Sequence, residues 1–281
     1  MSGAVHAGYA PPTGPSEPTP TRRRSRWLLA VTVVWGVVLA VLTWVSVRTD
    51  GPTVREQRTL AQAGPVVDRA VGELVAAAGG RVVTLAPERI TSGCRVTPML
   101  DGAALERAVE IMTGGDDPRA VLEQVSDRLP ASWRAGVLAT GDGPRLRADA
   151  GEFVAVAGRP AGDGRVRLTV ATGCRPVGDG YRPPAVQGGP EADALAAALR
   201  ALGNPGGPAP QTLAAPCPGG GSARTARVTL DPVPTEPARA LAPVAAGAVL
   251  LDAPEVYAYR QGPVTVALTG GELTATTGCA A

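Results

Sequence analysis

Residues 27–47 form a long, uncharged and mostly apolar run, WLLAVTVVWGVVLAVLTWVSV. This run is long enough for a helix that crosses about 30 Å of hydrocarbon. Trp27 and Trp44 lie near its ends, where interfacial aromatic residues gather, and the basic sequence TRRRSR precedes it. Because basic flanks stay in the cytoplasm, we expect one transmembrane helix with the N-terminus inside and residues 48–281 outside.

A cleaved signal peptide is the alternative explanation of this run. Its apolar region is shorter, about 7–15 residues, and ends at a small-residue cleavage site. Here the run is followed by VRTDGPTV, which has no such site, so we expect a retained anchor. Residues 1–26, with several prolines and no apolar pattern, are predicted to be a disordered cytoplasmic tail. We expect this tail to be exposed to solvent without a specific role. The alternative is phosphorylation at four of its hydroxyl residues, Thr13, Ser16, Thr19 and Thr21.

Beyond the anchor, the spacing of apolar residues predicts both helices and strands. In residues 66–78 the apolar positions recur at helical spacing. Asp117 and Pro118 supply a helix N-cap and a proline at the first helical position. In residues 165–170 apolar and polar residues alternate, as in a strand with one buried face.

Two stretches of the chain repeat each other. The strand RVRLTVATGC (165–174) returns as GELTATTGC (271–279), and each copy ends in Thr-Gly-Cys. A proline-initiated helix and further strands precede each copy, and a predicted helix at 66–80 matches one at 191–204. Self-similarity on this scale indicates two copies of one module.

The predicted fold class is α+β. Each module is predicted as α-β-β-α-β-β-β, an antiparallel-leaning sheet with helices on one face. The chain is therefore expected to be an N-terminal transmembrane helix followed by two tandem, internally duplicated α/β-sandwich modules. The expected segments are a juxtamembrane stretch at 48–64, module 1 at 65–180, a linker at 181–190 and module 2 at 191–281. Because the linker region is rich in Pro and Gly, the orientation of the modules stays open between fixed and loose.

Four cysteines allow three pairings. The duplication favours Cys94 with Cys174 and Cys217 with Cys279, because the partners then occupy matching places in the two modules. Disulfides persist outside the membrane, where the surroundings are oxidising. Each bridge would add on the order of 4 kcal/mol in the chain-entropy model. A metal site or a redox-active pair is the alternative, but the chain has no C-x-x-C and no histidine to support these thiols.

Composition narrows the chemistry that the outer region can perform. The chain has 27 basic residues, all of them Arg, and 25 acidic ones. Beyond residue 26 the charges nearly balance, which argues against nucleic-acid binding. The single histidine, His6, lies in the tail, and there is no lysine, so triads with a histidine base and Schiff bases are excluded. We expect no metal and no cofactor.

Carboxylates and aromatic residues remain as candidates for chemistry. Asp116 and Asp117 are adjacent, but Asp117 is better explained as a helix cap. Tyr257 and Tyr259 alternate on one strand and are expected to share a face, whereas Trp133 is expected to fill the core. We therefore expect that the protein is not an enzyme and keep a carboxylate-dependent hydrolase as an alternative.

Five arginines lie on predicted strands of module 1 and in the hairpin between them. If these strands are adjacent, the arginines form a basic strip that contacts anionic lipid headgroups or wall polymers. The simpler and favoured explanation is that they occupy the solvent faces of strands, where charge prevents edge-to-edge aggregation. The five residues are Arg145, Arg147, Arg159, Arg165 and Arg167.

With its anchor, its disulfide modules and its twin Thr-Gly-Cys strands, the chain resembles single-pass, envelope-anchored proteins of high-GC Gram-positive bacteria, of the actinobacterial type. The resemblance implies a cell-surface location facing the wall and carries no catalytic residues. We expect a non-enzymatic binding or scaffold protein of the envelope, whose partner is another envelope protein or an anionic wall or lipid component. A sensor for a small extracellular ligand is the alternative, which the lack of a predicted inner domain disfavours.

Overall fold

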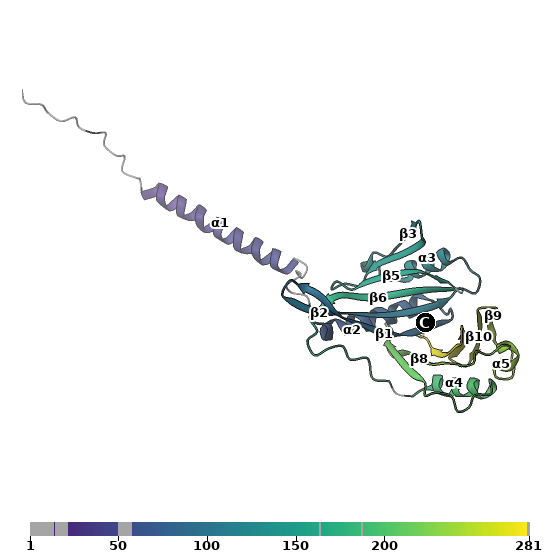
Figure 1. Ribbon diagram of the computed structural model, residues 1–281. Coiled ribbons are helices and arrows are strands. Elements are labelled where there is room, and N and C mark those ends of the chain that lie inside the picture. Colours follow the sequence, from purple (N-terminus) through teal and green to yellow (C-terminus); the bar gives the residue numbers. More distant parts are fainter. Residues whose placement is uncertain (1–13, 15–21, 50–57, 163, 187, 280–281) are drawn as a thin grey trace, which may run out of the picture. The chain divides into compact units, whose positions relative to one another are not determined.

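The computed structural model describes residues 14, 22–49, 58–162, 164–186 and 188–279. The chain divides into two compact units, Met1–Arg55 and Glu56–Ala281, which we describe in turn. The first unit holds helix α1 (Arg22–Thr49), drawn in purple in Figure 1. Its segment Trp27–Val45 is long and apolar enough to cross a membrane.

Helix α1 begins at Arg22, before the apolar run and within the segment expected to be a disordered tail. The helix includes residues 22–26 because arginine is a strong helix former and nothing in RRRSR ends the helix. Apart from Gly14, the rest of that tail lies outside the described residues, as do its four candidate phosphorylation positions and residues 50–57 of the expected juxtamembrane segment.

The second unit begins with module 1, which contains two helices and a six-stranded antiparallel sheet of order β1-β2-β6-β5-β4-β3. Its elements are α2 (Leu60–Ala77), β1 (Val83–Thr97), β2 (Leu100–Met112), α3 (Pro118–Arg128), the 3-10 helix η2 (Ala131–Trp133), β3 (Gly136–Thr140), β4 (Gly143–Asp149), β5 (Ala155–Gly162) and β6 (Arg165–Arg175).

Module 2 repeats this arrangement with a six-stranded sheet of order β7-β8-β12-β11-β10-β9. Its elements are α4 (Pro190–Ala201), β7 (Gln211–Pro216), β8 (Ser222–Thr229), α5 (Pro237–Ala245), β9 (Val249–Ala253), β10 (Val256–Gln261), β11 (Val264–Thr269) and β12 (Glu272–Thr277). The two strand orders match position by position, which confirms an α+β fold with two similar sheet modules. Each sheet has one strand more than predicted, because the stretch after the second helix folds into a short hairpin of its own.

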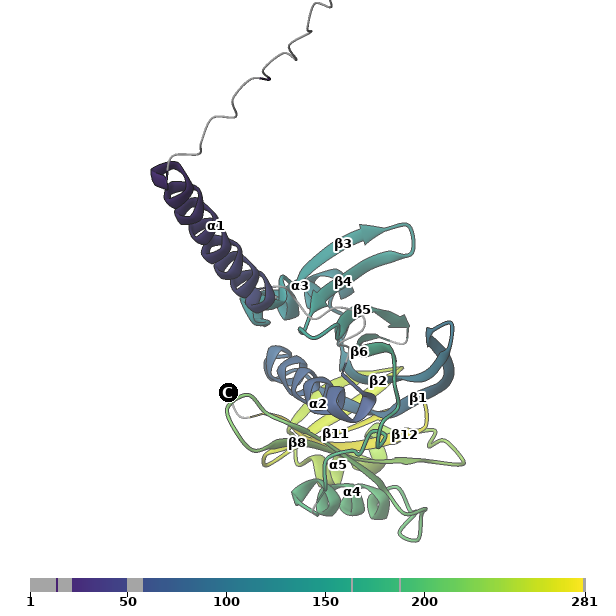
Figure 2. The same ribbon diagram turned by 90° about the vertical axis from the view of Figure 1, so that its left-hand side faces the viewer.

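The repeat extends to the register of the cores. Leu168 of β6 lies opposite Val109 of β2, and Leu273 of β12 lies opposite Val228 of β8. All four side chains are buried in the core of their own module. The helices α2 and α3 contact the first sheet, and α4 and α5 contact the second, as Figure 2 shows.

Helix α2 begins earlier than its apolar pattern indicates. Thr59 is its N-cap and forms a capping box with Gln62, in which each side chain bonds the backbone N–H of the other residue. Residues 60–64 of the expected juxtamembrane segment therefore belong to the helix, and Pro65 lies inside it. Helix α3 begins as predicted, with Asp117 as N-cap accepting a hydrogen bond from the Arg119 N–H.

Both predicted disulfides are present. Cys94 of β1 is bonded to Cys174 of β6, and Cys217 after β7 is bonded to Cys279 after β12. The bridges close loops with sequence separations of 80 and 62 residues. In each module the bridge links the edge strand, or the residue just after it, to the strand that lies two places away in the sheet. The two disulfides therefore occupy equivalent places in the two modules.

The two modules pack edge on face. Strand β1 is the free edge of the first sheet, and its Leu85 backbone bonds side chains of β8: the Leu85 N–H donates to Thr225 Oγ1 at 3.1 Å, and Arg227 donates to the Leu85 carbonyl at 3.3 Å. Nearby, Met112 of module 1 packs in an apolar cluster with Ala258 of module 2. The orientation of the modules is therefore fixed by direct contacts.

A buried ion pair reinforces this interface. Arg107 on β2 is only 2% exposed, and its guanidinium donates to Asp68 on α2 at 2.5 Å and to the Ala214 carbonyl on β7 at 2.9 Å. Tyr181 donates to the same Asp68 carboxylate at 2.7 Å. Burial raises the pKa of the Asp68 carboxyl, whereas the Tyr181 hydrogen bond and the Arg107 charge lower it. Tyr181 lies in the expected linker, which is thus attached to helix α2.

We expect Tyr181→Phe to lower the free energy of unfolding by about 1–3 kcal/mol, because Asp68 loses a hydrogen bond inside the protein. The matched control is Tyr259→Phe, since the buried Tyr259 hydroxyl has no hydrogen-bond partner among the described residues. That control should leave the unfolding free energy unchanged or raise it. Urea unfolding of the full chain in detergent measures both, and equal losses in the two variants would contradict the assignment.

A substitution at Gly72 tests how closely helix α2 approaches β7 at the interface between the modules. A Cβ atom at this position of α2 would lie 1.7 Å from the Pro216 carbonyl oxygen at the end of β7. Gly72→Ala should therefore destabilise the protein by about 1–3 kcal/mol through overpacking, although alanine is the better helix former. Gly136→Ala, where a Cβ meets open space, serves as the control in the same unfolding experiment. A Gly72→Ala variant more stable than the native chain would refute this close approach.

Candidate functional site

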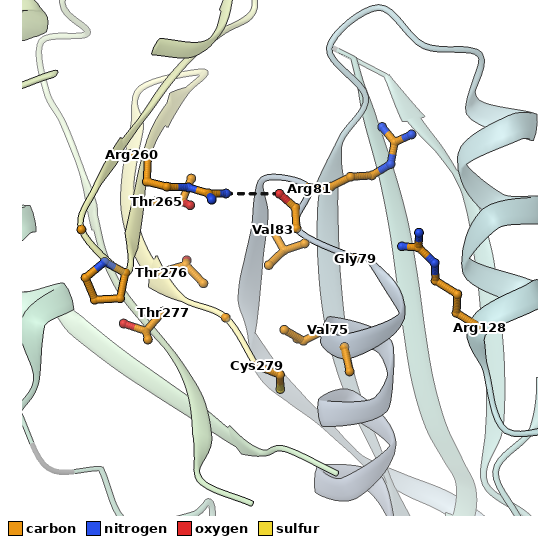
Figure 3. Close-up of a pocket in the computed structure, with 15 residues that line it drawn as sticks. Val75, Gly79, Arg81, Val83, Arg128, Arg260, Thr265, Thr276, Thr277 and Cys279 are labelled. Atoms are coloured by element: carbon orange, nitrogen blue, oxygen red, sulfur yellow. Dashed lines mark hydrogen bonds between the residues drawn. The ribbon is translucent and has the colours of Figure 1, made fainter. Parts of the chain in front are cut away.

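A groove of about 730 Å³ lies between the two modules. One wall is the end of helix α2 with the loop that follows it, and the other is the part of the second sheet that module 1 leaves uncovered (Figure 3). The residues on the module 1 side are Val75, Ala76, Gly79, Gly80, Arg81, Val83 and Arg128. Those on the module 2 side are Arg260, Gly262, Pro263, Thr265, Thr276, Thr277, Gly278 and Cys279.

The module 2 wall presents a row of polar side chains across neighbouring strands. Arg260 of β10 lies opposite Thr265 of β11, Thr265 lies opposite Thr276 of β12, and Thr276 lies opposite Thr225 of β8. Thr225 and Thr276 are buried and share a hydrogen bond of 2.9 Å between their hydroxyls. Figure 3 shows Arg260, Thr265 and Thr276 on the same wall, across the groove from Val75 and Val83.

This row is a property of module 2 and not of the fold. The equivalent register in module 1 runs from Asp149 through Ala155 and Ala171 to Glu106. Module 1 therefore forms the same sheet with alanine in place of the two central threonines and with acidic residues at both ends. The sheet itself therefore does not require this arginine and these hydroxyls. Thr225 and Thr276 are used by their mutual hydrogen bond, whereas Thr265 makes no side-chain hydrogen bond to the described residues.

Three arginines surround the mouth of the groove. Arg260 donates to the Gly80 carbonyl and Arg128 to the Ala77 carbonyl, each at 3.4 Å, at the end of helix α2 where carbonyl groups carry partial negative charge. Arg81 is held by Asp116 at 2.7 Å and by Gln124. The described residues that line the groove include no Asp or Glu, so its lining is net positive.

The five arginines of the predicted basic strip lie on β4, β5 and β6, which are neighbours in the first sheet. Most of their charge is compensated: Glu110 of β2 pairs with Arg167 at 2.7 Å and with Arg165 at 3.3 Å. Arg145 pairs with Asp142 at 3.5 Å. Arg147 and Arg159 are exposed, and neither has an ion-pair partner among the described residues.

No local sequence pattern predicts that Glu106 and Glu110 lie beside the strip. Strand β2 is far from β6 in the chain, and only the strand order places them next to each other. Glu106 adds a weaker contact of 3.9 Å to Arg167. The strip therefore reduces to two uncompensated arginines, Arg147 and Arg159, as candidates for contact with an anionic surface.

The other candidate residues have structural positions. Trp133 is buried in the core of module 1, as expected. Tyr257 and Tyr259 share a face, as expected, but this face packs in the core of module 2 and not in the groove. Burial raises the pKa of Tyr259 to about 12. Asp116 and Asp117 bond Arg81 and the start of α3.

Among the described residues, no group of three or more His, Cys, Asp or Glu side chains is placed to hold a metal ion. All four cysteines are in disulfides, and Cys279 contributes to the groove wall. The sequence did not identify the groove, since its walls come from segments about 200 residues apart that meet only through the edge-on-face packing.

Comparison of the chain with protein-family models, with curated proteins and with solved structures gives no match. Family membership therefore assigns no role to any residue of the groove, and its chemistry follows from its geometry alone.

The two central threonines are expected to respond differently to substitution. Thr276→Val removes the hydroxyl that pairs with the buried Thr225, and should lower the unfolding free energy by about 1–3 kcal/mol. Thr265 is half-buried and makes no side-chain hydrogen bond to the described residues, so Thr265→Val should cost less than ~0.5 kcal/mol. Urea unfolding distinguishes the two. Equal losses would show that the Thr225–Thr276 pair is not a stabilising contact.

Proposed function

We propose that the chain is a non-enzymatic, membrane-anchored binding protein of the cell envelope, with residues 48–281 on the outer side. The apolar segment Trp27–Val45 and the arginines that precede it support a single anchor with an inner N-terminus. Two disulfides in a chain without free cysteines support an oxidising compartment for the modules.

The observation that carries the proposal is the positively lined groove between two rigidly joined modules. The Thr265 hydroxyl, which has no side-chain partner among the described residues, can both donate and accept a hydrogen bond, and Arg260 offers a planar set of donors suited to phosphate or carboxylate. The ligand class that fits is an anionic, hydroxyl-rich envelope component, such as a polyol phosphate or a carboxylated glycan. Interface contacts hold the two walls against each other, and the Cys217–Cys279 disulfide holds the end of the module 2 wall. A groove held in this way reduces the ordering cost of binding.

A sensor for a small extracellular ligand is the second candidate, and the volume of the groove favours it. Sites for small molecules occupy about 300–1,000 Å³, and this groove lies within that range. A carboxylate-dependent hydrolase is less well supported, because such enzymes place two carboxylates at the bond that is cleaved. The described lining residues offer none.

The test uses the full chain in lipid nanodiscs and a soluble glycerol-phosphate oligomer as the probe. Arg260→Ser should weaken binding of the oligomer about tenfold, equivalent to ~1.4 kcal/mol, because a charge-assisted contact is lost. Arg239→Ser is the matched control, since Arg239 lies on the exposed surface of α5 in the same module. Isothermal titration calorimetry at two salt concentrations measures both variants.

The outcomes separate the candidates. If a neutral dextran of equal length binds as well as the phosphate oligomer, the ligand is not anionic and the assignment fails. If binding is unchanged in Arg260→Ser but lost in the Arg147→Ser/Arg159→Ser variant, the binding surface is the open face of the first sheet and not the groove. Saturable binding of a mononucleotide-sized anion with no gain from the longer oligomer would favour the small-ligand sensor.

A further inference from the structure

One end of module 1 carries four exposed apolar side chains. This end is where the described chain resumes at Arg58, after residues 50–57, and continues into helix α2. We call it the tether-side surface. Its apolar residues, with their exposed fractions, are Met99 (96%), Leu100 (45%), Phe153 (47%) and Val177 (44%).

Arg175 brings the segments of this surface together. Its buried guanidinium donates to the Arg58 carbonyl at 3.2 Å, where the chain resumes, and to the Glu152 carbonyl in the loop before β5. The Leu60 N–H donates to the Pro176 carbonyl at 2.8 Å, which fixes the start of α2 against the end of β6. Phe153 and Val177 are therefore held at the point where the tether joins module 1.

The β1–β2 hairpin projects from the same end. The disulfide of Cys94 joins this hairpin to β6, and Gly102 packs directly against the Arg175 carbonyl. Beyond that point the two strands continue to the turn that carries Met99, which is followed by Leu100 as the first residue of β2. Met99 is the most exposed large apolar side chain among the described residues, which has no explanation in the packing of module 1.

The loop that carries Phe153 has an unusual backbone. Glu152 and Phe153 both have positive φ, 52° and 59°, which side chains other than glycine rarely adopt. The Val154 N–H donates to the Gly151 carbonyl and closes this turn. The conformation leaves the Phe153 ring about half-exposed. Backbone strain of this kind is found most often at functional sites.

The length of the tether limits how far this surface can lie from the bilayer. Nine peptide units separate Thr49, the end of α1, from Arg58, and whatever their conformation they span at most about 30 Å. This reach is less than the diameter of about 40 Å expected for a globular unit of this size. The tether-side surface is therefore kept close to the lipid at high effective concentration, where weak apolar contacts suffice for association.

We propose that the tether-side surface inserts its apolar side chains into the outer interfacial region of the membrane in which the chain is anchored. The occupant is lipid: Met99 and Phe153 enter between headgroups, and the exposed Arg95 lies at the level of the lipid phosphates. Arg58 lies at the same level but is already paired with Glu152 at 3.1 Å. The inference rests on the proposed membrane anchoring and is independent of the ligand of the groove. Module 1 would then contact the membrane. The threonine wall of the groove belongs to module 2, which follows module 1 in the sequence.

The test places the photo-crosslinker p-benzoylphenylalanine in the full chain, reconstituted in vesicles of phosphatidylglycerol and phosphatidylethanolamine. Three single variants carry it in place of Met99, Phe153 or Leu138. Leu138 is the matched control, because it is apolar and 60% exposed but lies beside the β3–β4 turn, at the opposite end of β4 from the Phe153 loop. Mass spectrometry should find lipid adducts at positions 99 and 153 at least about fivefold above position 138. Equal yields at all three positions would overturn the proposal.

A second measurement separates this proposal from the anchoring on which it rests. Extraction at alkaline pH shows whether each variant is embedded in the vesicles. A chain that is released contradicts the anchoring itself, whereas an embedded chain without adducts at 99 and 153 contradicts only the surface contact. In a Met99→Asp/Phe153→Asp variant, the lipid adducts of a crosslinker at Val177 should fall at least about fivefold with unchanged thermal unfolding. Undiminished adducts, or protein adducts in place of lipid ones in whole cells, would refute the lipid contact.

Discussion

A buried guanidinium must find its hydrogen-bond acceptors within the protein, and in this chain that requirement joins the two modules. Arg107 donates hydrogen bonds to a carboxylate of helix α2 and to a backbone carbonyl of β7, which belong to different modules. If module 2 moved away, a buried charge would lose an acceptor at a cost of several kcal/mol. The register shows that Ala226 occupies the equivalent position in module 2, so the arginine serves the interface and not the fold of the module.

The same interface resolves the problem of an open sheet edge. An unpaired edge strand presents backbone groups that invite aggregation. Strand β1 is such an edge, and side chains of β8 form hydrogen bonds with the backbone N–H and carbonyl of Leu85. Because β1 covers only part of the second sheet, the remaining part becomes the wall of the groove. The groove thus results from the way in which the edge is protected, and its arginine and threonine residues occupy the uncovered register positions.

The features that are local or repeated could be predicted from the sequence. The apolar length of α1, the Asp117 cap, the alternation in β6 and both disulfides were predictable, because each depends on short-range pattern or on comparison of the two copies. The groove, the pairing of Arg165 and Arg167 with Glu110, and the role of Tyr181 were not. Each depends on segments that become neighbours only through strand order or module packing, which no local pattern encodes.

Edge-on-face packing is not reciprocal: module 1 contributes an edge and a helix, and module 2 contributes a sheet face. The equivalent edge in module 2, strand β7, is already covered, because helix α2 packs against it and its Ala214 carbonyl accepts from Arg107. The equivalent face of the first sheet is open, with Arg147 and Arg159 exposed on it. The twin face on the first sheet carries Arg145 and Arg147 where the docked face carries Val256 and Ala258. Charge at these positions opposes the docking of a sheet edge from another molecule on this face.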